Sequence, residues 1–160
     1  MKSRLLASLA LAAAAVVGLT GCTFMTPQST TIEYSPADGV NVDGSAPLEV
    51  RNAVVVANPE GTAGNLIAAV VNPTGEALTL RMEVGQARVP AMLRVPANSV
   101  VSLGAQGEPP LELERFEGIP GTNVEIYFQS GDVNGVSTAV PVVDGSLPYY
   151  ADLAPQPIVD

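Results

Sequence analysis

The sequence lacks histidine and tryptophan, and it contains one cysteine, Cys22, and one lysine, Lys2. Without histidine, neither a Ser-His-Asp nor a Cys-His catalyst can be assembled, and no histidine zinc site can form. Because Lys2 precedes Cys22, a chain that begins at Cys22 also lacks a Ser-Lys pair, a Schiff-base lysine and a P-loop. No side chain of such a chain titrates near neutral pH unless a carboxylate is strongly perturbed. A carboxylate pair could still act on glycosides, but nothing in the sequence singles out one pair. We therefore predict that the protein is not an enzyme.

The first 22 residues have the pattern of a lipoprotein signal peptide. Two basic residues near the start are followed by a run at 5–18 that is apolar or small except for one serine. This run is shorter than a typical membrane-spanning helix. It leads into Leu-Thr-Gly-Cys, the lipobox pattern, in which small residues fit the signal peptidase and the thiol receives diacylglycerol. The sequence therefore predicts a signal peptide at 1–21, signal peptidase recognition through Leu19, Thr20 and Gly21, and lipidation of Cys22.

The predicted lipid also fixes the predicted location. Acyl chains such as palmitate on Cys22 would hold the protein at the cell membrane, on its extracytoplasmic face. With its one cysteine acylated, the exported chain can have no internal disulfide. We predict no cofactor other than this covalent lipid.

The charge of the remaining chain excludes a nucleic-acid partner. Residues 22–160 contain sixteen acidic side chains and five arginines, a net charge of −11. Such a chain repels phosphate backbones and anionic headgroups. A favoured partner should be basic or neutral, and the membrane should be reached through the lipid.

Two-residue alternation of apolar and polar side chains dominates the sequence after residue 47 and indicates strands. No stretch after Cys22 shows helical periodicity. We predict an all-β fold, an antiparallel Ig-like or cupredoxin-like β-sandwich of about seven strands. The expected strands lie at 48–56, 66–71, 78–84, 89–95, 101–103, 124–129 and 136–142, with a further short strand at 111–114.

The alternation also predicts which side chains point into the core. In the first run, Leu48, Val50, Val54 and Val56 should share one face. Met82 is in phase with core residues, whereas the phase of Met92 predicts exposure; two thioethers without a histidine or thiolate make a poor copper site. A calcium loop at 38–49 fails, because Gly39 stands where the first carboxylate is needed and Glu49 is one residue short of the last ligand position. We predict no metal site, with a weaker, irregular calcium site left as an alternative.

Turn signals separate the strands. Asn-Pro-x-Gly at 58–61 and again at 72–75 favours type I turns, and 131–135 has the composition of a hairpin loop. Pro90, Pro96 and Pro141 should lie on edge strands or at strand ends, because proline cannot donate to a ladder.

These signals divide the chain into four parts. The acylated cysteine and a flexible polar tether occupy 22–31, and the sandwich domain with an ordered N-terminal loop occupies 32–145. A proline-rich tail, expected to be extended or disordered, occupies 146–160.

Several blocks resemble the periplasmic copper chaperones of the PCuAC type. These blocks are Gly-Asn-Leu at 64–66, Asn-Pro-Thr-Gly-Glu-Ala-Leu at 72–78, Val-Pro-Ala-Asn-Ser-Val at 95–100, the strand at 121–128 and Val-Pro-Val at 140–142. The resemblance spans about residues 48–143 and implies a cupredoxin-like or Ig-like sandwich. The copper ligands of that family are histidines and methionines. They do not carry over, because the corresponding late segment at 108–114 reads Glu-Pro-Pro-Leu-Glu-Leu-Glu.

With its lipobox and the motif Tyr-Ser-Pro-Ala-Asp-Gly-Val-Asn at 34–41, the chain more closely resembles the LpqE-type lipoproteins of actinobacteria. That resemblance implies a membrane-anchored, non-catalytic accessory domain associated with the respiratory cytochrome bcc–aa3 complex. The alternative is a degenerate copper chaperone that delivers metal to an oxidase. For partner contacts, aromatic anchors are favoured, although the two tail tyrosines could instead cover the sandwich. The candidate contact residues are Tyr34, Asp38, Asn41, Tyr149 and Tyr150.

Overall fold

The computed structural model describes residues 3–4, 6–12, 37–105 and 107–155. The chain divides into two compact units, Met1–Tyr34 and Ser35–Asp160. In the first unit, residues 6–12 are helical. None of the helices within the described ranges combines the length and apolar character needed to cross a membrane. The predicted lipobox at 19–22 and the tether lie outside the described residues.

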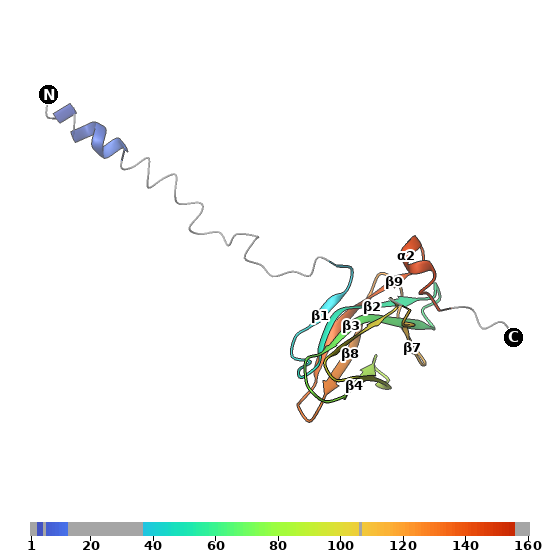
Figure 1. The fold of residues 1–160 in the computed structure, drawn as a ribbon. Coiled ribbons are helices and arrows are strands. Elements are labelled where there is room, and N and C mark those ends of the chain that lie inside the picture. The colour runs from blue at the N-terminus through green and yellow to red at the C-terminus, as the bar shows by residue number, and fades with distance from the viewer. Residues whose placement is uncertain (1–2, 5, 13–36, 106, 156–160) are drawn as a thin grey trace. The chain divides into compact units, whose positions relative to one another are not determined.

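The described part of the second unit is built almost entirely from strands (Figure 1). Its elements are β1 (Val40–Val42), β2 (Glu49–Ala57), β3 (Gly64–Asn72), β4 (Leu78–Val84), β5 (Val89–Val95), β6 (Ser99–Leu103), β7 (Leu111–Leu113), β8 (Asn123–Ser130), β9 (Val136–Asp144) and α2 (Pro148–Ala151). The seven predicted strands are present, with bounds that differ by no more than two residues. β7 confirms the further short strand, and β1 lies in a segment that the sequence predicted as loop.

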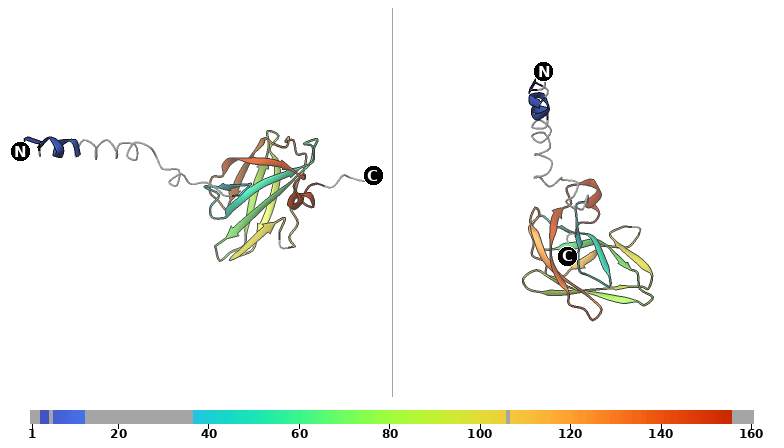
Figure 2. Two further views of the ribbon diagram at one scale, coloured as in Figure 1. Left: turned by 90° about the horizontal axis from the view of Figure 1, so that it is seen from above. Right: turned by 90° about the vertical axis from the view of Figure 1, so that its left-hand side faces the viewer.

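The strands form one mixed sheet that nearly closes on itself, as the right-hand view of Figure 2 shows. Its order is β5-β4-β8-β9-β2-β3-β6, with β1 added beside β2 and β7 beside β3. The two ends of this path, β5 and β6, approach each other. The predicted all-β, sandwich-like fold is confirmed. One feature was not predicted: β9 pairs with β2 in parallel, whereas every other pairing is antiparallel.

The core lies inside the closed sheet and follows the predicted alternation. Met82 is opposite Phe128 and Val84 is opposite Ile126 across the β4–β8 pair, and all four side chains are buried. Burial of each such side chain stabilises a fold by about 1.5–3 kcal/mol. Met92, out of phase on β5, is 61% exposed, which confirms its predicted position.

A buried asparagine helps to close the sheet. The Nδ2 group of Asn72, at the end of β3, donates to the carbonyl oxygens of Glu76, Val95 and Pro96 at 2.8, 3.2 and 2.9 Å. Its Oδ1 atom accepts from the backbone N–H and the hydroxyl of Thr74. Asn72 therefore fixes its own turn and also joins the end of β3 to the end of β5.

The predicted phase of β2 is wrong in its second half. Its register with β3 shifts between Arg51 and Val54, and Asn52 adopts a φ of 51°. This bulge reverses which side chains point inward. The central core cluster therefore contains Leu48, Val50, Ala53, Val55 and Ala57, but not Val54 or Val56.

The turn and proline predictions are largely confirmed. The N–H of Gly61 donates to the carbonyl of Asn58 at 2.9 Å, which confirms a β-turn at 58–61, and 131–135 joins β8 to β9. At 72–75 the N–H of Thr74 instead donates to Oδ1 of Asn72 at 3.0 Å. Pro90 lies on the edge strand β5, and Pro96 follows its end. Pro141 lies within β9, at the last residue paired with β8 and directly before the residues paired with β2. A missing donor is tolerated there because the strand changes partners.

The first part of the tail is not extended, contrary to the prediction. Residues 148–151 form α2, and the amides of Leu153 and Ala154 donate to the carbonyl of Tyr150. The Nδ2 group of Asn65 on β3 donates to the carbonyl of Leu153 at 2.9 Å. Asn65 is paired with Val56 of β2, so this hydrogen bond fixes the segment beside the β2–β3 pair.

Candidate functional site

The N-terminal loop positions Asp38 through the glycine that follows it. The N–H of Gly39 donates to Oδ1 of Asn52 at 2.9 Å. A Cβ at Gly39 would lie 2.6 Å from the carbonyl oxygen of Ala53, so no larger residue fits against the bulge without a backbone shift. The Asp-Gly pair of the sequence motif therefore has a structural reason: the glycine packs on β2 and leaves the aspartate at the surface.

The C-terminal helix positions the two tyrosines. Asp144, at the end of β9, accepts hydrogen bonds from the N–H and hydroxyl of Ser146, which forms the turn into α2. Pro148 occupies the first helical turn, where its missing N–H costs nothing. A helix of one turn is unstable alone, so its stability comes from packing on the sheet.

Asp38 meets Tyr149 and Tyr150, although more than 100 residues separate it from them in the sequence. The Tyr150 hydroxyl donates to Oδ2 of Asp38 at 2.9 Å, and the Tyr149 hydroxyl lies 3.4 Å from the same oxygen. The two rings are tilted by 58°, with centroids 4.6 Å apart, a favourable arrangement for neighbouring aromatic rings. We call these three residues the tyrosine–aspartate cluster.

The two tyrosines differ in exposure. Tyr150 is 7% exposed and covers the sheet, whereas Tyr149 is 59% exposed and Leu147 is 45% exposed. An exposed aromatic ring beside an exposed aliphatic side chain and a carboxylate is a common composition of protein docking surfaces.

The two phenols keep their protons at physiological pH. Burial, together with the hydrogen bond and charge of Asp38, raises the pKa of Tyr150 to about 12. Burial and the Asp38 charge also raise the pKa of Tyr149. Neither phenol can serve as a general base near neutral pH. The arrangement can bind through aromatic and hydrogen-bonding contacts.

Asn41 is not part of the cluster. It lies on β1, and its Oδ1 accepts from the N–H of Asn52 at 3.1 Å, which holds β1 against the bulge. Tyr34 and the lipidation residues Leu19, Thr20, Gly21 and Cys22 lie outside the described residues. Leu147 was missed by the sequence reasoning. Its position directly before Pro-Tyr-Tyr was the available signal.

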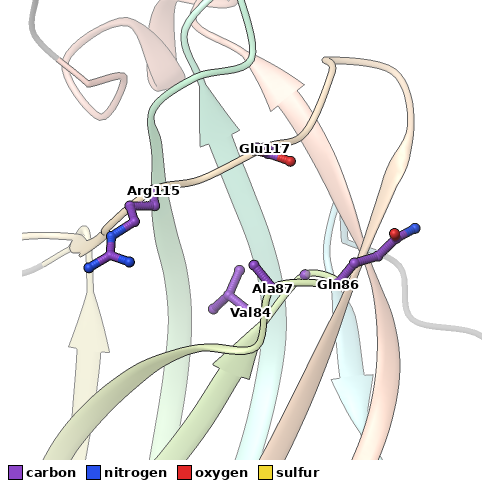
Figure 3. Close-up of a pocket in the computed structure, with 6 residues that line it drawn as sticks. Val84, Gln86, Ala87, Arg115 and Glu117 are labelled. Carbon is purple, nitrogen blue, oxygen red and sulfur yellow. The ribbon is translucent and has the colours of Figure 1, made fainter.

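A hollow of about 230 Å³ lies between the turn after β4 and the loop at 115–117. In Figure 3 the Val84 and Ala87 side chains point toward this loop, while the polar ends of Arg115 and Gln86 extend away on opposite sides. The polar ends of Arg115 and Gln86 therefore do not converge on the hollow. Among the described residues, no group of three or more cysteine, aspartate or glutamate side chains is placed to hold a metal ion.

Comparisons with known proteins identify the fold. No family model and no curated protein matches the chain. Among solved structures, the apo PCuAC domain of PmoF2 is 16% identical with a TM-score of 0.50, over 67% of this chain and 97% of that domain. The copper-bound form of that domain gives 18% identity and a TM-score of 0.48, over 64% of this chain and 97% of that one. The apo PCuAC domain of PmoF1 gives 13% and 0.47, over 65% and 98%.

Identities this low show the fold alone. Of these three structures, the apo PmoF2 domain, with a TM-score of 0.50, supports the shared fold. The domain thus shares its fold with a PCuAC domain, and the resemblance noted in the sequence is confirmed at the level of architecture.

Proposed function

We propose that this protein is a lipid-anchored, extracytoplasmic accessory protein whose β domain acts as a non-catalytic interaction module. The observation that carries the proposal is the tyrosine–aspartate cluster with Leu147. It presents exposed apolar and aromatic surface at the place where the N-terminal loop meets the C-terminal segment. Exposed aromatic side chains are favoured anchors in contacts between proteins.

The anchor follows from the lipobox at 19–22. Acylation of Cys22 would hold the domain on the outer face of the cell membrane by a tether at 22–31. A domain confined to that surface meets membrane proteins at high effective concentration, so even a small docking surface suffices.

The partner we favour is a membrane protein complex, specifically the respiratory cytochrome bcc–aa3 assembly. Support comes from the resemblance of the motif at 34–41 to LpqE-type lipoproteins, and Asp38 belongs to both that motif and the cluster. The charge of −11 beyond residue 21 favours a basic or neutral docking surface on the partner.

The alternative is a degenerate copper chaperone that delivers metal to an oxidase. The fold shared with the apo PmoF2 PCuAC domain favours it. Against it, the sequence has no histidine, and Met82 is buried in the core. Titration of Cu(I) against the mature protein with a competing chelator separates the two proposals. Retention of Cu(I) at micromolar metal would favour the chaperone, and complete loss to the chelator would end it.

The docking proposal is tested by affinity purification of the full-length protein from native membranes in mild detergent, with mass spectrometry of what is recovered. We expect a membrane complex with the wild-type protein and at least tenfold less of it with Tyr149→Ala. Met92→Ala is the matched control, because Met92 is equally exposed but lies on β5. Recovery only as a free monomer, or equal losses with both variants, would contradict the proposal.

The lipid is tested separately by intact-mass analysis of the native protein. We expect residues 1–21 to be absent and the mass of Cys22 to be increased by acyl chains. An unmodified thiol at Cys22 would remove the basis for the proposed location.

A further inference from the structure

A surface groove of about 840 Å³ lies beside the turn into α2, whose residues 144–146 line it. One wall is the turn between β2 and β3 at 58–63, and the other is formed by 144–146 and 154–155. Its surface is mainly apolar and is contributed by short side chains, which leave an open trough: Ala57, Pro59, Ala63, Ala154 and Pro155. Ser146 also lines the groove, and Leu147 of the proposed docking surface is the next residue.

Both walls are fixed before anything binds. In the first wall, Oδ1 of Asn58 accepts from the N–H groups of Thr62 and Ala63 at 2.9 and 3.0 Å. The carbonyl of Gly61 accepts from the N–H of Gly118 at 3.0 Å, which ties this turn to the next loop. In the second wall, the amide of Ala154 donates to Tyr150 in α2. A groove with rigid walls binds without the entropic cost of ordering them.

The groove is negatively charged. Two of its lining side chains are carboxylates, Glu60 and Asp144, one on each wall, and none of its lining residues is a cation. Hydrogen bonds from the side chain and backbone of Ser146 lower the pKa of Asp144, so this carboxylate is ionised at neutral pH. Asn58 donates to one oxygen of Glu60 and Ser146 donates to one oxygen of Asp144, so the second oxygen of each carboxylate can face a bound cation.

We propose that this groove binds a short protein segment that carries an arginine or lysine flanked by aliphatic residues. The cation would lie between Glu60 and Asp144, and the aliphatic side chains would cover the alanine and proline surface. Charge complementarity selects this occupant: the walls offer two anions, and the chain beyond residue 21 carries −11 overall. This inference rests on the proposed docking function and names the chemistry of the segment that the partner supplies.

The probe is a fluorescein-labelled, amidated hexapeptide, Ala-Leu-Arg-Leu-Pro-Ala, titrated with the acylated mature protein in detergent and followed by fluorescence anisotropy. A peptide with norleucine in place of arginine tests the charge. We expect the arginine peptide to bind at least tenfold more tightly than the norleucine peptide, and to weaken as salt rises.

The variants are chosen to change charge without changing shape. In the double variant Glu60→Gln and Asp144→Asn, the side-chain oxygens still accept from Asn58 and Ser146. We expect it to lose at least tenfold in affinity for the arginine peptide. The control, Glu112→Gln with Asp132→Asn, makes the same charge change outside the groove and should lose no more than twofold.

Equal binding of the two peptides, or equal losses in the two double variants, would overturn the proposal. Binding of spermidine without binding of the arginine peptide would also overturn it, in favour of a small cation. If membrane purification recovers the partner equally with the groove variant and with wild type, the groove proposal falls while the docking function stands. If the peptide binds as expected but only free monomer is recovered from membranes, the docking function falls instead.

Discussion

Replacement of Tyr150 by phenylalanine tests whether the tyrosine–aspartate cluster holds α2 on the domain. The change removes one hydroxyl and leaves the buried ring in place. That hydroxyl donates to Asp38 at 2.9 Å. A hydrogen bond to a charged acceptor stabilises a fold by about 1.5–3 kcal/mol, and the exposure of Asp38 reduces this contribution. We expect Tyr150→Phe to lower the free energy of unfolding by about 1 kcal/mol at pH 7.

The pH dependence gives a sharper test. The pKa of Tyr150 rises from 10.0 to about 12 in the folded protein. Because the folded value is the higher one, the neutral phenol stabilises the fold fully below pH 10, and this stabilisation is lost as the pH rises toward 12. A difference of two pH units corresponds to at most about 2.7 kcal/mol. Wild type should therefore lose stability relative to Tyr150→Phe in this range, and the variant should become the equal or more stable protein.

Urea unfolding of both proteins from pH 7 to pH 11.5 measures the difference directly. Tyrosines common to both proteins cancel in the comparison. Tyr149→Phe is the control, because that hydroxyl lies farther from Asp38, at 3.4 Å, on an exposed ring. Its effect at pH 7 should be smaller. A difference between wild type and Tyr150→Phe that stays constant over the whole pH range would refute the reasoning.

Three further predictions concern the scaffold that holds the cluster. A Cβ at Gly64 would lie 2.8 Å from the buried ring of Phe116, so Gly64→Ala should lower the free energy of urea unfolding by about 1–3 kcal/mol. The control is Gly75→Ala, which should change stability by less than about 0.5 kcal/mol, because a Cβ at Gly75 has nothing within 4 Å. The buried Ser130 hydroxyl donates to one backbone carbonyl and accepts from one backbone N–H, so Ser130→Ala should cost about 1–3 kcal/mol by thermal unfolding, and an unchanged midpoint would contradict its structural role. Asn52→Ala should lower the free energy of unfolding by about 1–2 kcal/mol and speed hydrogen exchange in β1. Alanine disfavours a φ of 51°, and the change removes the side-chain acceptor of the Gly39 N–H.

The candidate site was only partly predictable from the sequence. Asp38, Tyr149 and Tyr150 were each predicted as partner contacts, for separate reasons: a motif before the first strand and an aromatic pair in the tail. Their meeting through one carboxylate oxygen was not predictable, because 111 and 112 residues separate the tyrosines from Asp38. Asn41, also predicted as a partner contact, lies on β1 and accepts a hydrogen bond from Asn52 in the β2 bulge, outside the cluster.

The bulge itself shows why alternation has limits. A period of two fixes which side chains share a face only while the strand is regular. One residue at a φ of 51° reversed the inward face of β2, and the sequence contained only a polar Arg-Asn pair as a sign of it.

The sequence by itself determined the strands, most of the turns and the exclusion of histidine chemistry, because alternation, turn preferences and composition are local properties of the chain. The tertiary structure decided the parallel pairing of β9 with β2, the helical turn at 148–151 and the groove between the two walls. Each of these depends on surfaces that only folding brings together, so no local pattern of residues specifies them.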